Sequence, residues 1–419
     1  MAETNPHRVL KFGGTSVGSP ETLRQALAIV QETAAAGPIA VVVSALSGVT
    51  DQLAALAHGT GRGLDAGRIV AALRARHSAL LAAVASGPAR REAEAASSGV
   101  WAGLDRDLAA IASGGDRTAC DALLATGERL AVPIFVAALR ARGLSAEGVD
   151  GTEVIRTDDT WGEANVDFPA TRALVARRLR SLPSEVVAVV TGFVGGTGDG
   201  RTTVLGRGGS DYTAAVLGAA LGADRVEIWS DVDGILSADP HLVNEAFTLE
   251  HLSYDEALAL ACGGARVLHP KTIPPLAASR ILVFVGNISR PEGVGSWVGA
   301  DSSWVENDSS SVENDSSWAV AKAVASIAIN GHATIRVLPS SLAASSRLGD
   351  LLHQVLARAD LAATPGPQDA HAVTVVVPTE HRARAVRAIH EALVKRAGPG
   401  PRPSRPIDLE TCRPTCPSD

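Results

Sequence analysis

Short β-branched segments alternate with longer Ala- and Leu-rich segments from residue 8 to residue 295. This pattern predicts strands at 9–12, 39–44, 186–191, 226–229 and 281–285, with the clearest helices at 22–35, 68–84 and 211–221. Strands that alternate with helices are typical of βαβ units, in which helices cover both faces of a mostly parallel sheet. Residues 62–140 are almost wholly helical in pattern and indicate a helical insertion. The sequence therefore predicts an α/β fold.

A smaller module follows the α/β part of the chain. Residues 305–318 repeat a polar heptad without an apolar seam, so we interpret 296–320 as a low-complexity linker rather than a coiled coil. Strands are expected at 324–329, 334–338 and 373–377 and helices at 348–359 and 381–395, an order that suits a small α+β module over 321–397. The Pro-rich tail, 398–419, is expected to be disordered, without a zinc site at Cys412 and Cys416.

The composition excludes several classes of protein. With 46% hydrophobic and 20% charged residues, the 419-residue chain has the balance of a folded protein of two or three domains. A net charge of −7 and an aromatic content of 3% argue against a nucleic-acid partner. Apolar runs such as 39–43 are shorter than the ~18 residues that span a membrane, and no apolar signal sequence precedes the first strand. We expect a cytoplasmic protein.

The first predicted strand runs into a pair of glycines. In the segment Lys11-Phe-Gly-Gly-Thr-Ser-Val17, Gly13 and Gly14 leave backbone N–H groups bare at the end of the strand, and Lys11 adds a cation beside them. This arrangement predicts an anion cradle. It is not a Walker A loop, in which the lysine follows the glycines. Taken alone, the motif could equally be a glycine turn beside an incidental lysine.

Hydroxyl and charged residues also lie after another predicted strand and at the start of a predicted helix. Ser44 and Thr50 follow the second predicted strand, where their hydroxyls could donate to a carboxylate or phosphate. Arg207 lies in a glycine-rich loop, and Asp211 begins the next predicted helix. A guanidinium that can bind a carboxylate in bidentate fashion is thus close in sequence to a carboxylate. Each of these residues by itself could instead be part of an ordinary turn, a helix cap or a favourable helix N-terminus.

Two later loops are candidate nucleotide contacts. The acidic loop 229–240 follows a predicted strand, and its Ser230 and Asp231 could hold ribose hydroxyls or a magnesium–nucleotide complex. The loop 263–272 supplies three cations, namely Arg266, His269 and Lys271. Surface loops that merely connect two elements are the alternative interpretation of both segments.

Taken together, six motifs resemble those of aspartate kinases within the wider amino-acid kinase group. In chain order they are KFGGTSV, VVSALSGVTD, ATGE at Ala125–Glu128, TTVLGRGGSDYTA, WSDVDG and GARVLHPKT. The resemblance is strong over 8–295 and continues weakly to about residue 395, and the helical insertion is most similar to the lysine-sensitive monofunctional type. It implies an open αβα sandwich as a catalytic domain over 1–295 and an ACT-like regulatory module over 321–397.

The resemblance also implies an activity, in which the γ-phosphoryl group of MgATP passes to the β-carboxylate of L-aspartate to give 4-phospho-L-aspartate. It implies catalytic roles for Lys11 and Asp211, substrate contacts from Ser44, Thr50, Glu128 and Arg207, and nucleotide contacts from Gly13, Gly14, Ser230, Asp231, Leu236, His241 and Arg266. Physical chemistry agrees, because a side-chain carboxyl with a pKa of ~3.9 is already ionised at neutral pH. Such a reaction needs positioning and charge neutralisation rather than a general base.

The nucleotide loop departs from the family pattern. Where the family has Thr-Asp-Val, a tyrosine and Asp-Pro-Arg, this chain has Ser230-Asp-Val, Leu236 and Asp239-Pro-His241. The chain therefore lacks an aromatic ring and a permanent cation, since a histidine is only partly charged at neutral pH. We predict weaker binding of ATP in an enzyme that is still active.

The C-terminal module departs from the family as well. The family carries two ACT modules, which bind lysine or threonine at a subunit interface, whereas 321–397 resembles a single module. Residues 338–347 stand where the lysine-sensitive type has a glycine-containing effector loop, and the Pro-containing segment 362–368 replaces the next strand. We predict weak or absent feedback by lysine or threonine. A lone module of this kind also favours a homodimer.

Two other functions stay open at this point. The chain could be a kinase of another amino-acid carboxylate, although Ser44, Glu128, Arg207 and Asp211 argue against a large change of substrate. It could also be a catalytically silent subunit that senses an amino acid, which the altered nucleotide loop favours and the intact Lys11 disfavours. The sequence does not specify whether the product leads to lysine, threonine and methionine or to a dedicated product.

Overall fold

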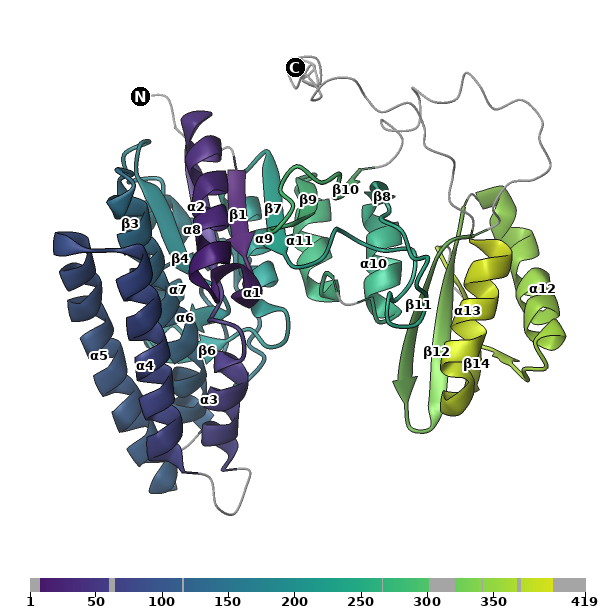
Figure 1. The fold of residues 1–419 in the computed structure, drawn as a ribbon, viewed down its shortest axis with the longest axis horizontal. Coiled ribbons are helices and arrows are strands. Elements are labelled where there is room, and N and C mark those ends of the chain that lie inside the picture. Colours follow the sequence, from purple (N-terminus) through teal and green to yellow (C-terminus); the bar gives the residue numbers. More distant parts are fainter. Residues whose placement is uncertain are drawn as a thin grey trace.

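A computed structural model describes residues 8–59, 65–114, 117–265, 267–300, 321–340, 342–367 and 371–394. The predicted heptad linker, the Pro-rich tail and Arg266 lie outside the described residues. Figure 1 shows a large α/β part on one side and a smaller module on the other. The predicted fold class is confirmed, because strands and helices alternate along the large part and the module has its own sheet.

The large part is built on an eight-stranded sheet with the order β3-β4-β2-β1-β7-β9-β10-β8. Its strands are β1 (Arg8–Phe12), β2 (Ile39–Val43), β3 (Ala146–Val149), β4 (Val187–Thr191), β7 (Arg225–Ser230), β8 (His251–Ser253), β9 (Leu282–Asn287) and β10 (Ser296–Gly299). Every pairing is parallel except that of β9 with β10. Because β1 lies between β2 and β7, the carboxyl ends of these three strands meet at one edge of the sheet.

Helices cover both faces of this sheet. They are α1 (Gly14–Val17), α2 (Pro20–Ala35), α3 (Val49–His58), α4 (Ala66–Val84), α5 (Gly87–Ala112), α6 (Arg117–Ala141), α7 (Gly151–Val154), α8 (Phe168–Arg178), α9 (Gly209–Leu221), α10 (Tyr254–Cys262), the 3₁₀ turn η1 (Pro270–Thr272) and α11 (Ile273–Ala278). A short hairpin of β5 (Val194–Gly196) and β6 (Thr202–Val204) precedes α9. The predicted helical insertion is confirmed as α4, α5 and α6, which lie side by side in Figure 1.

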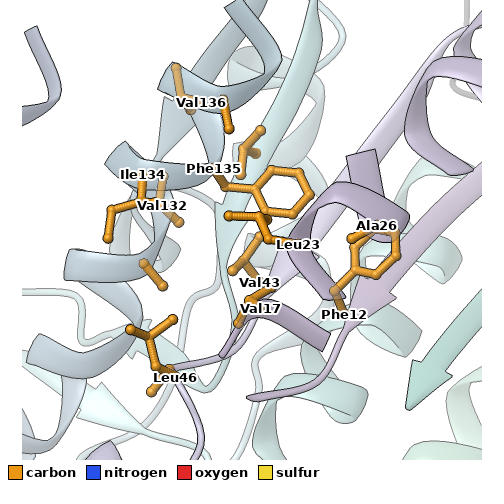
Figure 2. Packing of buried hydrophobic residues seen from close by; sticks show 14 of the residues in the cluster. Phe12, Val17, Leu23, Ala26, Val43, Leu46, Val132, Ile134, Phe135 and Val136 are labelled. Carbon is orange, nitrogen blue, oxygen red and sulfur yellow. The ribbon is translucent and has the colours of Figure 1, made fainter. Parts of the chain in front are cut away.

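The two faces of β1 enter two different hydrophobic clusters. Leu10 and Phe12 pack with the helices of the insertion, whereas Val9 packs with α9 on the opposite face. The Phe12 ring stacks on Phe135 of α6 with 5.7 Å between the ring centroids (Figure 2). Since side chains alternate along a strand, Lys11 projects to the same face as Val9, toward α9. The apolar residues of β1 thus fix the direction of its single lysine.

Helix α6 is the most buried helix of the insertion. It is long and apolar enough to cross a membrane by length and composition, but 78% of its apolar window is buried inside the large part. A helix that is apolar on most of its faces is typical of a position inside a core. The sequence analysis expected only short apolar runs and did not recognise α6 as a long apolar helix. Glu128 and Arg129 interrupt the apolar run of α6 in the sequence, although the helix around them is buried.

The module is a four-stranded antiparallel sheet with the order β11-β12-β14-β13, covered by two helices. Its elements are β11 (Ala321–Ile329), β12 (His332–Pro339), α12 (Leu342–Arg358), β13 (Thr364–Pro365), β14 (Val373–Pro378), the 3₁₀ turn η3 (Thr379–His381) and α13 (Arg382–Leu393). Ile335 of the sheet and Leu352 and Ile389 of the helices share its buried core. The predicted α+β character of the module is therefore observed.

Two details of the module correct the sequence-based predictions. The segment 338–347 is not one loop, because β12 extends to Pro339 and α12 begins at Leu342. The Pro-containing segment does not abolish the next strand, because Thr364 and Pro365 pair with β14 and the Gly366 amide donates to the carbonyl of Thr374 at 2.9 Å. Proline lacks a donor but keeps its carbonyl, so the prolines shorten this edge strand instead of removing it.

Candidate active site

Most of the predicted site residues lie at the carboxyl ends of β1, β2 and β7. In open α/β sheets, ligands bind at this edge because the loops that follow the strands face a common crevice. Lys11 precedes the last residue of β1, Ser44 directly follows β2, and Ser230 ends β7. The sheet thus brings together motifs that are up to about 220 residues apart in the sequence.

Lys11 and Asp211 form an ion pair with 2.6 Å between Nζ and Oδ1. Their side chains are only 10% and 15% exposed, so the pair is held between β1 and the first turn of α9. A buried pair is expensive to separate, since removal of one partner leaves the other charge uncompensated. The structure therefore brings these two predicted residues into contact and holds the lysine ammonium at the sheet edge.

Gly13 and Gly14 serve different purposes. A side chain at Gly13 would come within 3.4 Å of the Lys11 Nζ, and one at Gly14 would lie 2.8 Å from the carbonyl oxygen of Ala45. The expectation that both amides face a ligand is wrong for Gly13, because its N–H donates to the carbonyl of Trp229 at 3.1 Å. This bond joins the end of β1 to the end of β7. Of these two glycines, Gly14 is the one whose amide makes no hydrogen bond within the described residues.

The loop after β2 is packed between two other motifs. The Ser47 amide donates to the carbonyl of Gly14 at 3.1 Å, and a side chain at Gly127 would meet the Ala45 Cβ at 2.6 Å. Ser44 is half-buried at the end of the strand, and Thr50 lies in the first turn of α3. The short side chains of this loop allow β1, β2 and α6 to approach closely.

Glu128 of α6 is buried beside the loop after β2. Its Oε1 accepts a hydrogen bond of 3.1 Å from the Ala45 amide, while its Oε2 has no hydrogen-bond partner among the described residues. Burial raises the pKa of Glu128 to about 8, and the Ala45 amide and the positive charge of Lys11 oppose the rise. A buried carboxyl oxygen without a partner at this edge is suited to bind a cationic group from outside.

The glycine-rich loop before α9 exposes Arg207. This residue lies between Gly206 and Gly208, both at positive φ, and its guanidinium makes no hydrogen bond or ion pair within the described residues. A side chain at Gly208 would collide with the Cβ of His269, which packs directly against this loop. Burial lowers the pKa of His269, and the neighbouring Lys271 lowers it further. Lys271 itself pairs with Glu163 at 2.5 Å.

The loop 231–250 joins β7 to β8, and we call it the β7–β8 loop. Of the predicted nucleotide contacts, Asp231 and His241 are exposed on it, and Leu236 is half-buried and forms a bridge to Thr248. The His241 amide donates to Oδ1 of Asp239 at 2.9 Å. Hence Leu236 and His241 lie on the same loop as Asp231, which directly follows the end of β7.

Sequence reasoning missed the end of β4, which lies next to β2 at the same edge. Phe193 adopts a positive φ of 68°, which is uncommon for an aromatic residue, and its amide donates to the Thr213 hydroxyl of α9 at 3.0 Å. A side chain at Gly192 would lie 2.6 Å from the Ser210 hydroxyl oxygen. The glycines that follow β4 in Thr191-Gly-Phe-Val-Gly-Gly were the available signal.

The fold and the site residues define an α/β domain whose charged side chains gather at the carboxyl end of a parallel sheet. A model of the amino acid kinase family matches residues 7–287. The chain belongs to this family.

Within the family the chain is similar to aspartokinases. It is 38% identical over 290 residues to the lysine-sensitive aspartokinase 3 of Escherichia coli, a match that covers 69% of this chain and 63% of that protein. It is 34% identical over 267 residues to aspartokinase 2 of Bacillus subtilis, covering 63% of this chain and 52% of that protein. The chain thus spans between about half and two-thirds of the length of these relatives.

Solved structures give the same result over a longer part of the chain. The structure of E. coli aspartokinase III in complex with aspartate and ADP, described as its R-state, matches with a TM-score of 0.78 and 27% identity, covering 93% of this chain and 100% of that one. The same enzyme in complex with lysine and aspartate, its T-state, matches with a TM-score of 0.72 and 26% identity, covering 93% and 99%. The likeness therefore includes the module as well as the large part.

Proposed function

We propose that this chain is an aspartate kinase, which transfers the γ-phosphoryl group of MgATP to the β-carboxylate of L-aspartate. The observation that carries the proposal is the buried ion pair of Lys11 with Asp211 at the carboxyl end of the central strand. It supplies a fixed cation at the edge where the amino-acid kinase fold would receive two anionic substrates. The similarity to aspartokinases supports aspartate as the phosphoryl acceptor.

In this reaction an oxygen of the ionised β-carboxylate attacks the γ-phosphorus. The new O–P bond forms as the bond between the γ-phosphorus and the β–γ bridging oxygen breaks, so 4-phospho-L-aspartate and ADP are the products. No general base is required, because a carboxylate with a pKa of ~3.9 is already ionised at neutral pH. Lys11 would offset the charge on the transferring group, and Asp211 would hold Lys11 in place.

Two charged groups are suited to bind the other end of L-aspartate. The unpaired Oε2 of Glu128 would accept the substrate ammonium group, and the Arg207 guanidinium would bind the α-carboxylate in bidentate fashion. The hydroxyls of Ser44 and Thr50 would donate to the carboxylates from the loop after β2 and from α3. The substrate would thus be held at both ends while its β-carboxylate faces Lys11.

The nucleotide would bind along β7 and the β7–β8 loop. Ser230 and Asp231 would contact the ribose, and the Gly14 amide would donate to a phosphate oxygen. No group of three or more His, Cys, Asp or Glu side chains that could hold a metal ion occurs within the described ranges. Mg²⁺ would arrive with ATP and be held mostly by phosphate oxygens and water, as this ion prefers.

The test is release of ADP by the purified chain with MgATP, measured with and without L-aspartate, with Lys11→Ala in parallel. Turnover that depends on aspartate and disappears in the variant would support the proposal. Turnover that depends instead on another amino-acid carboxylate would replace the substrate, and no turnover with any of them would favour a silent amino-acid-sensing subunit.

We further propose a homodimer that resides in the cytoplasm. Strand β11 is an edge strand of the module sheet, and Ile327 and Ile329 near its end are 38% and 60% exposed. Large apolar side chains on an edge strand favour pairing with a second copy. Analytical ultracentrifugation of the wild-type chain and an Ile329→Lys variant would test the pairing, since the charge should shift the mass from dimer toward monomer.

A further inference from the structure

The middle of the β7–β8 loop packs against the module. Ala238 and Val243 of the loop belong to the buried core of the module, together with Val324 of β11 and Ile389 of α13. Leu242 and Phe247 pack against the same core. The middle of the loop is therefore held by apolar contacts with the C-terminal module.

Ser237 is the residue at which loop and module are joined by hydrogen bonds. Within the loop, its amide donates to the carbonyl of Phe247 at 2.8 Å and its hydroxyl accepts from the Phe247 amide at 3.1 Å. Toward the module, its carbonyl accepts from the Val324 amide of β11 at 2.8 Å, and its hydroxyl lies 3.0 Å from Nε2 of His390. Ser237 is fully buried, so these bonds are shielded from water.

The partner of the Ser237 hydroxyl in the module is His390 of α13, 153 residues further along the chain. Its side chain is buried, and its ring lies 6.2 Å from the Phe247 ring, measured between centroids. A hydroxyl can both donate and accept, so Ser237 complements either neutral tautomer of the imidazole. His390 thus contacts both residues that close the base of the loop.

A second contact reaches the outer part of the loop. Arg382, the first residue of α13, lies 3.9 Å from Oδ2 of Asp239 and is itself fixed by hydrogen bonds to Ser326 of β11. Oδ1 of the same Asp239 accepts the amide of His241. The module therefore contacts the loop within the segment that carries Leu236 and His241 and also after it.

From these contacts we propose that the C-terminal module is a structural part of the nucleotide site, and that His390 is a positioning residue for ATP binding. The proposal rests on the proposed kinase function, in which the β7–β8 loop contacts the nucleotide. In the free large part, the loop would lose its apolar packing and two of the hydrogen bonds of Ser237. The module then contributes to nucleotide affinity by holding the loop in place.

The experiment uses the full chain and three variants: His390→Leu, His390→Gln and His353→Leu. His390→Leu keeps the volume and removes the hydrogen bond, whereas the glutamine amide can reach the position of the histidine Nε2. His353 is an exposed histidine of α12 whose ring bonds only within its own helix, so His353→Leu is the matched control. Michaelis constants for ATP and aspartate, kcat and Tm are measured for each chain.

We expect His390→Leu to raise the KM for ATP about fivefold, the effect of one hydrogen bond of ordinary strength, with kcat and the KM for aspartate within about twofold of wild type. His390→Gln should recover most of the affinity, and His353→Leu should match the wild type. A lower Tm of His390→Leu with an unchanged KM for ATP would overturn the proposal, because the contact would then serve stability alone.

Two further measurements keep the test decisive. If His390→Leu does not fold, Ser237→Ala removes the bond to His390 together with the bond from the Phe247 amide, and an unaltered KM for ATP there would also contradict the inference. If the wild-type chain shows no aspartate-dependent turnover, the proposed function fails, but equilibrium binding of MgADP to the same variants still tests the role of His390. Fivefold weaker binding to His390→Leu would support it, and equal binding would reject it.

Discussion

The backbone amide of Ala45 donates a hydrogen bond of 3.1 Å to Oε1 of Glu128, although 83 residues separate them in the sequence. The bond ties the loop after β2 to the middle of α6 and leaves Oε2 of the buried carboxyl without a partner among the described residues. Burial raises the pKa of Glu128 from 4.5 to about 8, so the free protein holds this group mostly protonated at neutral pH. Stability and substrate binding should therefore both depend on pH through this residue.

For stability, the unfolded chain releases the Glu128 proton above about pH 4.5, whereas the folded chain keeps it until about pH 8. The unfolded state thus binds fewer protons in this window, and the free energy of unfolding contributed by this group falls as pH rises. Glu128→Gln keeps an acceptor for the Ala45 amide and cannot ionise. We expect the variant to gain stability relative to wild type between pH 5 and 8, by on the order of a few kcal/mol.

Urea unfolding at several pH values measures this difference, with Glu94→Gln on the exposed face of α5 as the control for loss of a carboxylate. If the difference in the free energy of unfolding between Glu128→Gln and wild type stays constant from pH 5 to 8, the raised pKa of Glu128 is contradicted.

Substrate binding should also depend on pH through Glu128, because an ammonium group beside Oε2 favours the ionised carboxylate. The KM for aspartate should therefore fall in wild type as the pH approaches 8, and much less in Glu128→Gln.

Lys11→Met should abolish most turnover. The change removes the ammonium that would neutralise the transferring phosphoryl group, and loss of one such group typically costs 10²–10³ in kcat. The matched control is Lys322→Met, because Lys322 pairs with Glu256 at 2.9 Å in a partly exposed position far along the chain. That variant should retain kcat within about twofold. Comparable losses in both variants would argue against a special role for the Lys11–Asp211 pair.

Two glycines in neighbouring helices should respond oppositely to alanine. An added Cβ at Gly99 of α5 meets nothing within 4 Å, so Gly99→Ala should stabilise the protein by ~0.5–1 kcal/mol through helix propensity. At Gly127 of α6 the Cβ would lie 2.6 Å from the Cβ of Ala45, so Gly127→Ala should destabilise it by ~1–3 kcal/mol and raise the KM for aspartate. Urea unfolding curves of Gly99→Ala and Gly127→Ala measure both changes in the free energy of unfolding. A Gly127→Ala variant that is more stable than wild type would contradict the prediction.

Feedback by lysine or threonine should be weak. Among the described residues, 342–347 belong to helix α12 and β13 has only two residues, at the positions where the lysine-sensitive type is expected to have its effector loop and its next strand. We expect less than twofold inhibition by either amino acid at millimolar concentration in a steady-state assay. Strong inhibition by one of them would show that the shortened module still binds an effector.

The sequence predicted the architecture because apolar periodicity and strand-end glycines are local signals. Lys11 and Asp211 were identified for the same reason, each at the end of a recognisable element. Contacts between distant segments leave no such signal: nothing in the sequence around Gly13 shows that its amide is taken by Trp229, and nothing around His390 shows that it meets Ser237. The strand β13 was missed because two prolines obscure a pairing that needs only carbonyl acceptors.

The β7–β8 loop lacks the arginine that the family has at position 241. His241 stands where the family has an arginine, and it is exposed on a loop that Asp239 and the module hold in place. His241→Arg would restore a permanent positive charge on the loop proposed to contact the nucleotide, so the KM for ATP should fall about three- to tenfold with little change in kcat. His332→Arg, on the exposed start of β12, adds the same charge away from the loop and should leave the KM unchanged. An unchanged KM for ATP in His241→Arg would remove His241 from the nucleotide site and leave Ser230 and Asp231 as its contacts on this side.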